Sequence, residues 1–225
     1  MKRSEGELAK RVVVFLFGVF CMSFGIALSK QAELGTTPIS TVPAVLSDFT
    51  PLSIGEMTFL VNLIFIALQI VILRCDYRKS QLLQLPGLLV FSAFIDINMW
   101  LCRWIQTDSY ILEWVLCILS AVAVAFGVFL TLKSDVLVMP GDGLAAAISL
   151  KFNKPFAKMK ICVDSSLVIS ATVISLIVFR TLVDVREGTI FAAVAVGSLI
   201  KIYDKLIGKQ ITAALTGGDR MVSSI

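Results

Sequence analysis

Hydrophobic residues along this chain form long uninterrupted blocks instead of alternating with polar ones. The first block, VVVFLFGVFCMSFGIALS, runs through 18 residues without a charged side chain. At 1.5 Å per residue, a helix of this length crosses roughly 30 Å, about the thickness of the hydrocarbon core of a bilayer. The pattern therefore predicts an all-α, polytopic membrane protein with six transmembrane helices, at residues 12–29, 57–73, 86–102, 111–132, 161–179 and 188–203.

Two further helix-compatible segments, 36–49 and 140–152, are too short to cross a bilayer. Each offers about a dozen residues, or roughly 16–20 Å of helix. Pro38 follows two threonines, which favours a helix that begins at this proline. In the second segment, DGLAAAISL predicts a helix start capped by Asp142. We expect both segments to be re-entrant or interfacial half-helices.

The distribution of basic residues orients these helices. If both half-helices return to the side that they left, 16 of the 20 Lys and Arg residues fall on one side. If both crossed, the split would be 13 against 7. Because cytoplasmic loops carry the excess of Lys and Arg, six transmembrane helices with both termini in the cytoplasm is the better topology.

The chain also repeats itself. FGIALSKQAELGTTPISTVPAVLS is followed 102 positions later by FGVFLTLKSDVLVMPGDGLAAAIS, so that Pro38 matches Pro140. Three transmembrane helices per copy make the second copy enter from the opposite face, which predicts inverted three-span repeats. The first repeat would cover 1–110, with a cytoplasmic tail at 1–11, and the second 111–208, with a cytoplasmic tail at 209–225. The alternative is that two apolar thirds of one membrane protein look alike by composition alone.

Composition removes several classes of function. Hydrophobic residues make up 57% of the chain and charged residues 16%, against about a quarter charged in soluble domains. There is no histidine, and the five cysteines are scattered, so no metal site, disulfide or histidine-based catalysis is expected. No phosphate-binding G-x-x-x-x-G-K-[ST] motif occurs. We expect neither an enzyme nor a bound cofactor, and the net charge of +4 fits a membrane surface better than nucleic acid.

The candidate site lies at the two breaks that precede the half-helices. Helix N-termini that face each other near the midplane would present free N–H groups and partial positive charge to an anionic or zwitterionic solute. Asp96 would be a costly carboxylate inside a transmembrane helix, and Asn62 and Asp164 match at the same offset. The alternatives are interfacial loops with caps, and structural hydrogen bonds. The candidate substrate-binding residues are Gly35, Thr36, Thr37, Pro38, Ser40, Thr41, Asn62, Asp96, Pro140, Gly141, Asp142, Gly143 and Asp164.

With its G-I-A-L…LGTTPISTVP block and its later MPGDGLA block, the chain resembles the YczE/YyaS/YitT-like family of bacterial integral membrane proteins. The resemblance covers most of residues 10–208. It implies a multi-pass protein of the bacterial plasma (inner) membrane and says little about a substrate.

Three functions remain open. The leading hypothesis is a small transporter or exporter that binds a solute between the two half-helices, with the halves rocking around it. The second is the substrate-binding membrane subunit of an ATP-driven importer, docked through the small-residue stretches 120–127 or 191–198. The third is a non-transport membrane accessory protein. The expected partners are the lipid bilayer and a small-molecule solute, with a homodimer left open.

Overall fold

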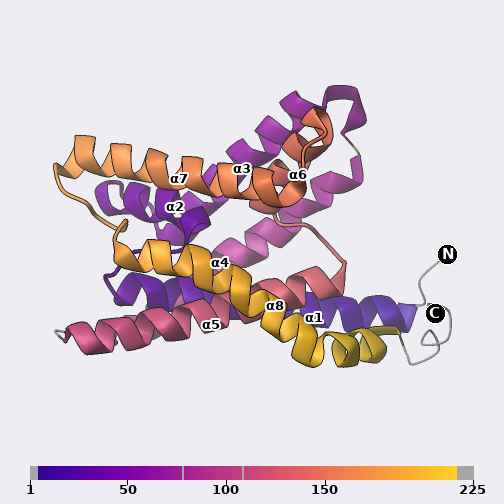
Figure 1. Ribbon diagram of the computed structural model, residues 1–225, viewed down its shortest axis with the longest axis horizontal. Helices are drawn as coiled ribbons and strands as arrows, with labels where there is room; N and C mark the ends of the chain where they lie inside the picture. The colour runs from indigo at the N-terminus through magenta and orange to yellow at the C-terminus, as the bar shows by residue number, and fades with distance from the viewer. Residues whose placement is uncertain (1–4, 78, 108, 217–225) are drawn as a thin grey trace.

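The computed structural model describes residues 5–77, 79–107 and 109–216, and these residues contain helices but no strands (Figure 1). Residues 1–4 and 217–225 of the expected tails, and Arg78, lie outside the described residues. The α-helices are α1 (Glu5–Gln31), α2 (Pro38–Phe49), α3 (Ile54–Leu73), α4 (Gln84–Cys102), α5 (Tyr110–Ser134), α6 (Pro140–Phe152), α7 (Phe156–Phe179) and α8 (Glu187–Thr216), with short 3-10 helices η1 (Arg74–Asp76) and η2 (Lys79–Leu83) before α4.

Within the described residues, five helical segments are long and apolar enough to cross a membrane. They are α1, α3, α5, α7 and the stretch Gln81–Cys102 that contains α4. The sixth expected block, 188–203, lies in the first part of α8, which then continues through charged turns to Thr216. The helical part of the chain therefore reaches beyond the expected start of the C-terminal tail at residue 209, just as α1 begins within the expected N-terminal tail.

The two short helices have the length that the sequence predicts, 12 residues in α2 and 13 in α6. Each has proline at its first position, after a residue in extended conformation, Thr37 or Met139. The expected cap at Asp142 is wrong. Asp142 sits within the first turn of α6, because the chain already becomes helical at Pro140, and Met139 occupies the capping position without a side-chain hydrogen bond.

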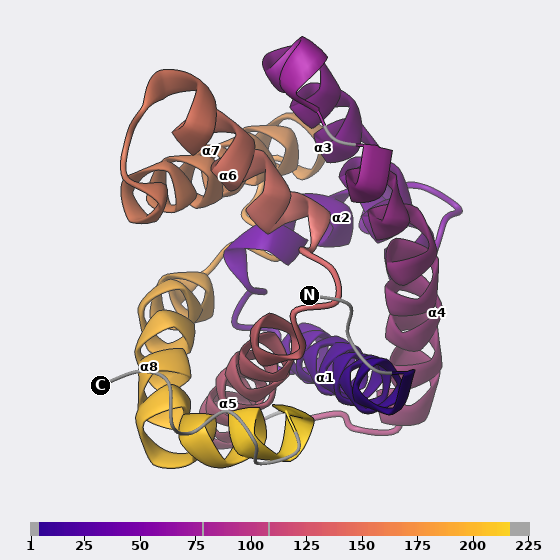
Figure 2. The same cartoon turned by 90° about the vertical axis from the view of Figure 1, so that its right-hand side faces the viewer.

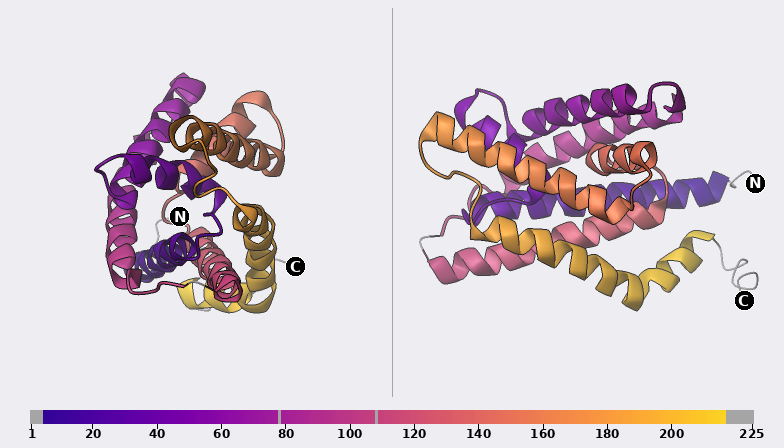
Figure 3. Two further views of the ribbon diagram at one scale, coloured as in Figure 1. Left: turned by 90° about the vertical axis from the view of Figure 1, so that its left-hand side faces the viewer. Right: turned by 45° about the horizontal axis from the view of Figure 1, so that its top comes forward.

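The order of long helix, short helix, long helix, long helix occurs twice along the chain. α2 and α6 begin 102 positions apart, and so do α3 and α7. Figures 1 and 3 show α2 and α6 in opposite halves of the molecule along its long axis, whereas α1 and α5 run through most of its length. In the end-on view of Figure 2 the longer helices form a ring, and α2 and the segment leading into α6 lie inside it.

α1 and α5 form the most extensive helix pair of the described residues, and glycines bring their backbones together. A Cβ atom at Gly127 would lie 2.5 Å from both the carbonyl oxygen of Gly18 and the backbone nitrogen of Met22. A Cβ atom at Gly25, 102 positions before Gly127, would lie 2.8 Å from the backbone nitrogen of Val124. Two further helix pairs join the first half of the chain to the second. α2 packs on α7, and α6 packs on α3.

Candidate functional site

The break after α1 folds onto the start of α8. Gly35 has φ +97°, a conformation that residues with a side chain rarely adopt. On either side of it, the carbonyl of Leu34 accepts a hydrogen bond from the backbone N–H of Gly188 at 2.8 Å, and the N–H of Thr36 donates to the carbonyl of Asp184 at 3.1 Å. The first break is therefore anchored by backbone hydrogen bonds to the other half of the chain.

Charged side chains tie the same corner together. The ammonium group of Lys30, at the end of α1, lies 2.8 Å from Asp48 Oδ1 at the end of α2 and 2.6 Å from Asp184 Oδ2 in the α7–α8 loop. Burial raises the pKa of Asp184 to about 6, which the charge of Lys30 opposes and the neighbouring Asp48 reinforces. Two carboxylates thus share one ammonium partner at this corner.

The second break makes the corresponding contact with α4. A Cβ atom at Gly87, in the first turn of α4, would lie 2.8 Å from the side chain of Leu137. Near the same break, the buried guanidinium group of Arg11 donates a hydrogen bond to the carbonyl of Ser134 at 2.9 Å. Each break is thus packed against a glycine near the start of the last helix of the opposite half, Gly188 in α8 or Gly87 in α4.

The two half-helices begin against each other. Gly141 leaves the space into which the side chain of Ile39 extends, and Phe65 of α3 lies beside them, 3.9 Å from the position of a Cβ atom at Gly141. α2 and α6 meet here from opposite halves of the molecule (Figure 1). The structure buries most of the candidate residues, namely Gly35, Thr36, Thr37, Pro38, Ser40, Thr41, Pro140, Gly141 and Gly143.

The hydroxyl groups at the start of α2 differ in their hydrogen bonding. Thr37 Oγ1 donates to Ser40 Oγ at 3.1 Å, and Thr41 Oγ1 donates to the carbonyl of Pro38 at 2.7 Å. The hydroxyl of Thr36 is buried and finds no hydrogen-bond partner among the residues that the structure describes. An unpaired polar group in a protein interior is costly. The Thr36 hydroxyl is therefore free to form a hydrogen bond at the break.

Gln69 of α3 is a further member of the site that the sequence reasoning missed. It is fully buried, and its Nε2 donates a hydrogen bond to the carbonyl of Pro140 at 3.0 Å. Its Oε1 has no hydrogen-bond partner among the described residues and lies 2.7 Å from the position of a Cβ atom at Gly143, so a larger residue there would require the end of the Gln69 side chain to move. The available signal was a lone amide inside the apolar run IALQIVIL, a position that is costly in a membrane unless it has a role.

Gln69 belongs to a polar stripe on the buried face of α3. Thr58, Asn62 and Gln69 follow each other at helical spacing, and all three are buried. Asn62 donates from Nδ2 to the carbonyl of Thr58 at 2.8 Å, and the hydroxyl of Thr58 has no hydrogen-bond partner within residues 5–77, 79–107 and 109–216. The side-chain amide of Asn62 thus donates to the backbone of its own helix.

Asp142 and Asp164 come together through Lys160. The ammonium group of Lys160 lies 2.9 Å from Asp142 Oδ1 in α6 and 2.9 Å from Asp164 Oδ1 one turn along α7. All three side chains are about a quarter exposed. The cluster carries one net negative charge beside the first turn of α6, and it joins two candidate residues that the sequence placed in different groups.

Asp96 lies apart from the half-helices. Its Oδ2 accepts from the Ser53 hydroxyl at 2.8 Å, and its Oδ1 accepts from the N–H of Gly55 at 2.9 Å. Asp96 of α4 therefore holds the N-terminus of α3, which is the structural hydrogen-bonding alternative. The partial positive charge of a helix start stabilises a carboxylate in this position.

The two small-residue stretches differ in exposure. Residues 120–127 lie in α5, where Gly127 packs on α1. Residues 191–198 lie in α8, where the Cβ position of Gly197 has no neighbour within 4 Å. Across the described residues, no group of three or more acidic, Cys or His side chains could hold a metal ion.

Known proteins match most of the chain, including both breaks. The family of unknown function DUF6198 matches residues 9–205. A relative, the uncharacterized protein YyaS of Bacillus subtilis (strain 168), is 23% identical over 196 residues, which are 86% of this chain and 92% of that protein. This confirms the expected resemblance to YyaS-like proteins. No solved structure matches the chain.

Proposed function

The chain belongs to the family of unknown function DUF6198, and we propose that it is a small secondary transporter whose solute binds between the starts of α2 and α6. In this proposal, α8 is the sixth transmembrane helix, and the two halves are inverted three-span repeats in a bacterial plasma membrane. Both termini lie in the cytoplasm. This topology keeps most of the Lys and Arg residues on the cytoplasmic side.

The observation that carries the proposal is the meeting of two half-helix N-termini inside a bundle of longer helices. Ile39 and Gly141, the second residues of α2 and α6, are in contact. The first-turn N–H groups of a helix have no partner within it, and they carry partial positive charge. Many secondary transporters bind solutes at such broken helices, with the N-terminal ends directed at anionic groups. An anionic or zwitterionic solute fits this arrangement best.

Two buried groups supply hydrogen bonds that the folded chain leaves unused. The hydroxyl of Thr36 and Oε1 of Gln69 lie at opposite breaks, one beside the start of α2 and one beside the start of α6. A solute between the breaks would satisfy both. Because each break is anchored to the other half of the chain, rocking of the halves would move both groups relative to each other.

The test is a comparison of binding, flux and stability in Thr36→Val. Purified protein is first exposed to a panel of carboxylates, amino acids and phosphate esters, and compounds that raise its melting temperature are followed as labelled solutes in proteoliposomes. Thr36→Val keeps the shape of the side chain and removes an unpaired hydroxyl, so stability should stay equal or rise. Solute affinity should fall by about tenfold, the effect of losing one good hydrogen bond.

Thr131→Val is the matched control. Thr131 is also buried, but its hydroxyl already donates to the carbonyl of Val128 at 2.9 Å within α5. This variant should lose about 1 kcal/mol of stability and transport normally. If no compound in the panel stabilises the protein or crosses the membrane, or if Thr36→Val transports like the wild type, the proposal is wrong.

A second candidate function is a membrane subunit of an ATP-driven importer, and the exposure of α8 favours it. Residues 193, 194, 197 and 198 of its small-residue stretch are exposed, which leaves a face for a partner helix. Co-purification of an ATPase from native membranes, lost in Gly197→Trp, would support this candidate over the secondary transporter.

A further inference from the structure

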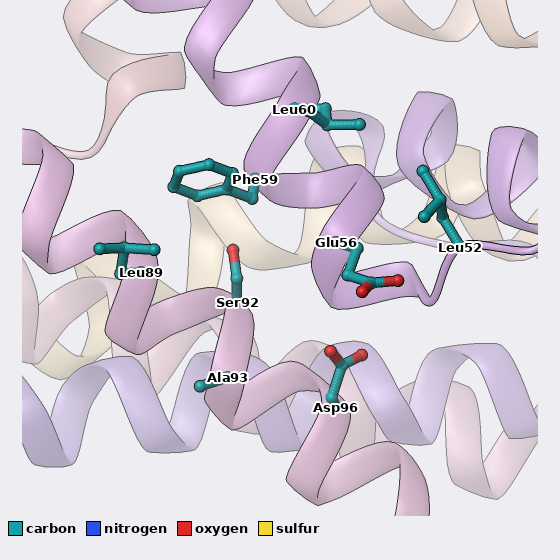
Figure 4. A pocket seen from close by; sticks show the side chains of 8 residues that line it. All are labelled: Leu52, Glu56, Phe59, Leu60, Leu89, Ser92, Ala93 and Asp96. Carbon is teal, nitrogen blue, oxygen red and sulfur yellow. The ribbon is translucent and has the colours of Figure 1, made fainter.

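A groove of about 410 Å³ lies between the N-terminal part of α3 and the middle of α4, apart from the half-helix starts (Figure 4). Its volume is within the range of sites that bind small molecules. Much of its wall is hydrophobic, and several of these side chains are exposed on the outer surface of the bundle. The hydrophobic lining residues are Leu52, Phe59, Leu60, Leu89 and Ala93.

Two carboxylates lie together in this groove. Glu56 of α3 and Asp96 of α4 occupy facing turns (Figure 4). Each uses part of its hydrogen-bonding capacity on the chain, since Glu56 Oε2 accepts from the N–H of Ser53 at 2.8 Å and Asp96 holds the start of α3. Within the described part of the chain, neither forms an ion pair with a Lys or Arg. The groove therefore holds two negative charges that no basic side chain balances.

A third polar group faces the same space. Ser92 is 7% exposed, and its buried hydroxyl has no hydrogen-bond partner in the described part of the chain. Figure 4 shows this hydroxyl directed into the groove between α3 and α4. An unpaired buried hydroxyl is costly, and here it lies among hydrophobic walls beside two carboxylates.

We propose that this groove binds an amphipathic primary ammonium compound. An ammonium group has three N–H donors and no acceptor, and Glu56, Asp96 and Ser92 offer three acceptor groups. Hydrogen bonds from a cation to carboxylates are strong, and they are stronger away from water. Phe59, Leu60 and Leu89 cover the hydrophobic body of the ligand. This groove is separate from the proposed solute site between α2 and α6, and the ammonium proposal does not depend on that solute site.

The experiment uses the full chain in phosphatidylglycerol nanodiscs. Binding of 4-phenylbutylammonium is measured by equilibrium dialysis, with empty nanodiscs subtracted, and is compared with 4-phenylbutanol and 5-phenylvalerate. The ammonium compound should bind, while the alcohol and the carboxylate bind at least about tenfold more weakly, because they lack the charge that the groove recognises.

Three variants test the location. Glu56→Gln keeps the capping box of α3, since Gln serves at that position too, and it should weaken ammonium binding at least about tenfold. Ala93→Phe fills the groove from an exposed position and should abolish binding. Glu113→Gln, which neutralises an acidic residue in the first turn of α5, should have no effect.

Equal binding of the three compounds, or unchanged ammonium binding in both Glu56→Gln and Ala93→Phe, would overturn the proposal. Adding phosphatidylethanolamine to the nanodiscs separates a lipid from a small molecule. If this lipid displaces the ammonium compound from the wild type, the proposed ligand class holds and the natural ligand is a lipid with an ammonium headgroup. Retained binding in its presence supports the proposal.

Discussion

Single glycines set how closely α1 and α5 approach each other, and Gly127 is the sharpest case. A Cβ atom there would meet backbone atoms of Gly18 and Met22 at 2.5 Å, and backbone cannot move aside as a side chain can. We expect Gly127→Ala to reduce the free energy of unfolding by about 1–3 kcal/mol. The measurement is thermal unfolding of the purified protein in detergent.

Gly197→Ala provides the control at the same scale. This glycine also lies within a helix, but nothing is within 4 Å of its Cβ position. Gly197→Ala should leave the free energy of unfolding unchanged or raise it by up to about 1 kcal/mol, because glycine weakens a helix interior. Equal stability of Gly127→Ala and Gly197→Ala would show that α1 and α5 do not pack as closely as described.

Residue types alone predicted where α2 and α6 begin but not what the neighbouring side chains contact. Pro38, after two threonines, and Pro140 marked the two helix starts, because Pro favours the first turn. Asp96 was recognised as unusual, yet its bonding to Ser53 and Gly55 depends on α3 and α4 lying side by side. Gln69 was missed because its role depends on a hydrogen bond to the carbonyl of Pro140, which lies 71 positions away in the sequence.

At the scale of elements, the corner between α1, α2 and the α7–α8 loop should respond to pH. The pKa of Asp184 is about 6 in the folded chain, above its ordinary value of 3.8, chiefly because of burial. The folded state therefore holds this proton more tightly than the unfolded state. The stability that Asp184 contributes is fully present below about pH 4 and is lost as the pH rises through about 6.

Asp184→Asn removes this titration. The melting temperature of the wild type, minus that of Asp184→Asn, should decrease between pH 4 and pH 6 and then level off. Asp76→Asn, at an exposed aspartate in η1, should follow the wild type throughout. Parallel curves for the wild type and Asp184→Asn would rule out a raised pKa at this corner.

Elements were predicted better than their ends. The short helices, the proline starts and the apolar helices all follow from local pattern, because length and hydrophobicity are properties of the segment itself. The cap of α6 was misassigned to Asp142, since the first turn already begins at Pro140. The long reach of α8 was missed as well, because its charged turns after residue 203 ended the apolar block without ending the helix.

For the whole molecule, sequence patterning gave the order of the helices but not their neighbours. With two copies of one pattern, a half-helix could pack within its own copy or across to the other. The structure does both, since α2 contacts α3 and α7, and α6 contacts α7 and α3. The contacts of Leu34 with Gly188 and of Leu137 with Gly87 join distant parts of the chain, and no local period encodes such pairs.

The orientation of the whole molecule in the membrane can be tested with three single-cysteine variants. If α2 and α6 both return to the side that they left, the α2–α3 loop and the α4–α5 loop share one side, and η1 lies on the other. In a chain with its five cysteines replaced, Thr50→Cys and Gln106→Cys should react with a membrane-impermeant maleimide in intact cells. Asp76→Cys should react only after permeabilisation. If α2 crossed the membrane, all three results would reverse, and its start could no longer meet that of α6 from the opposite side.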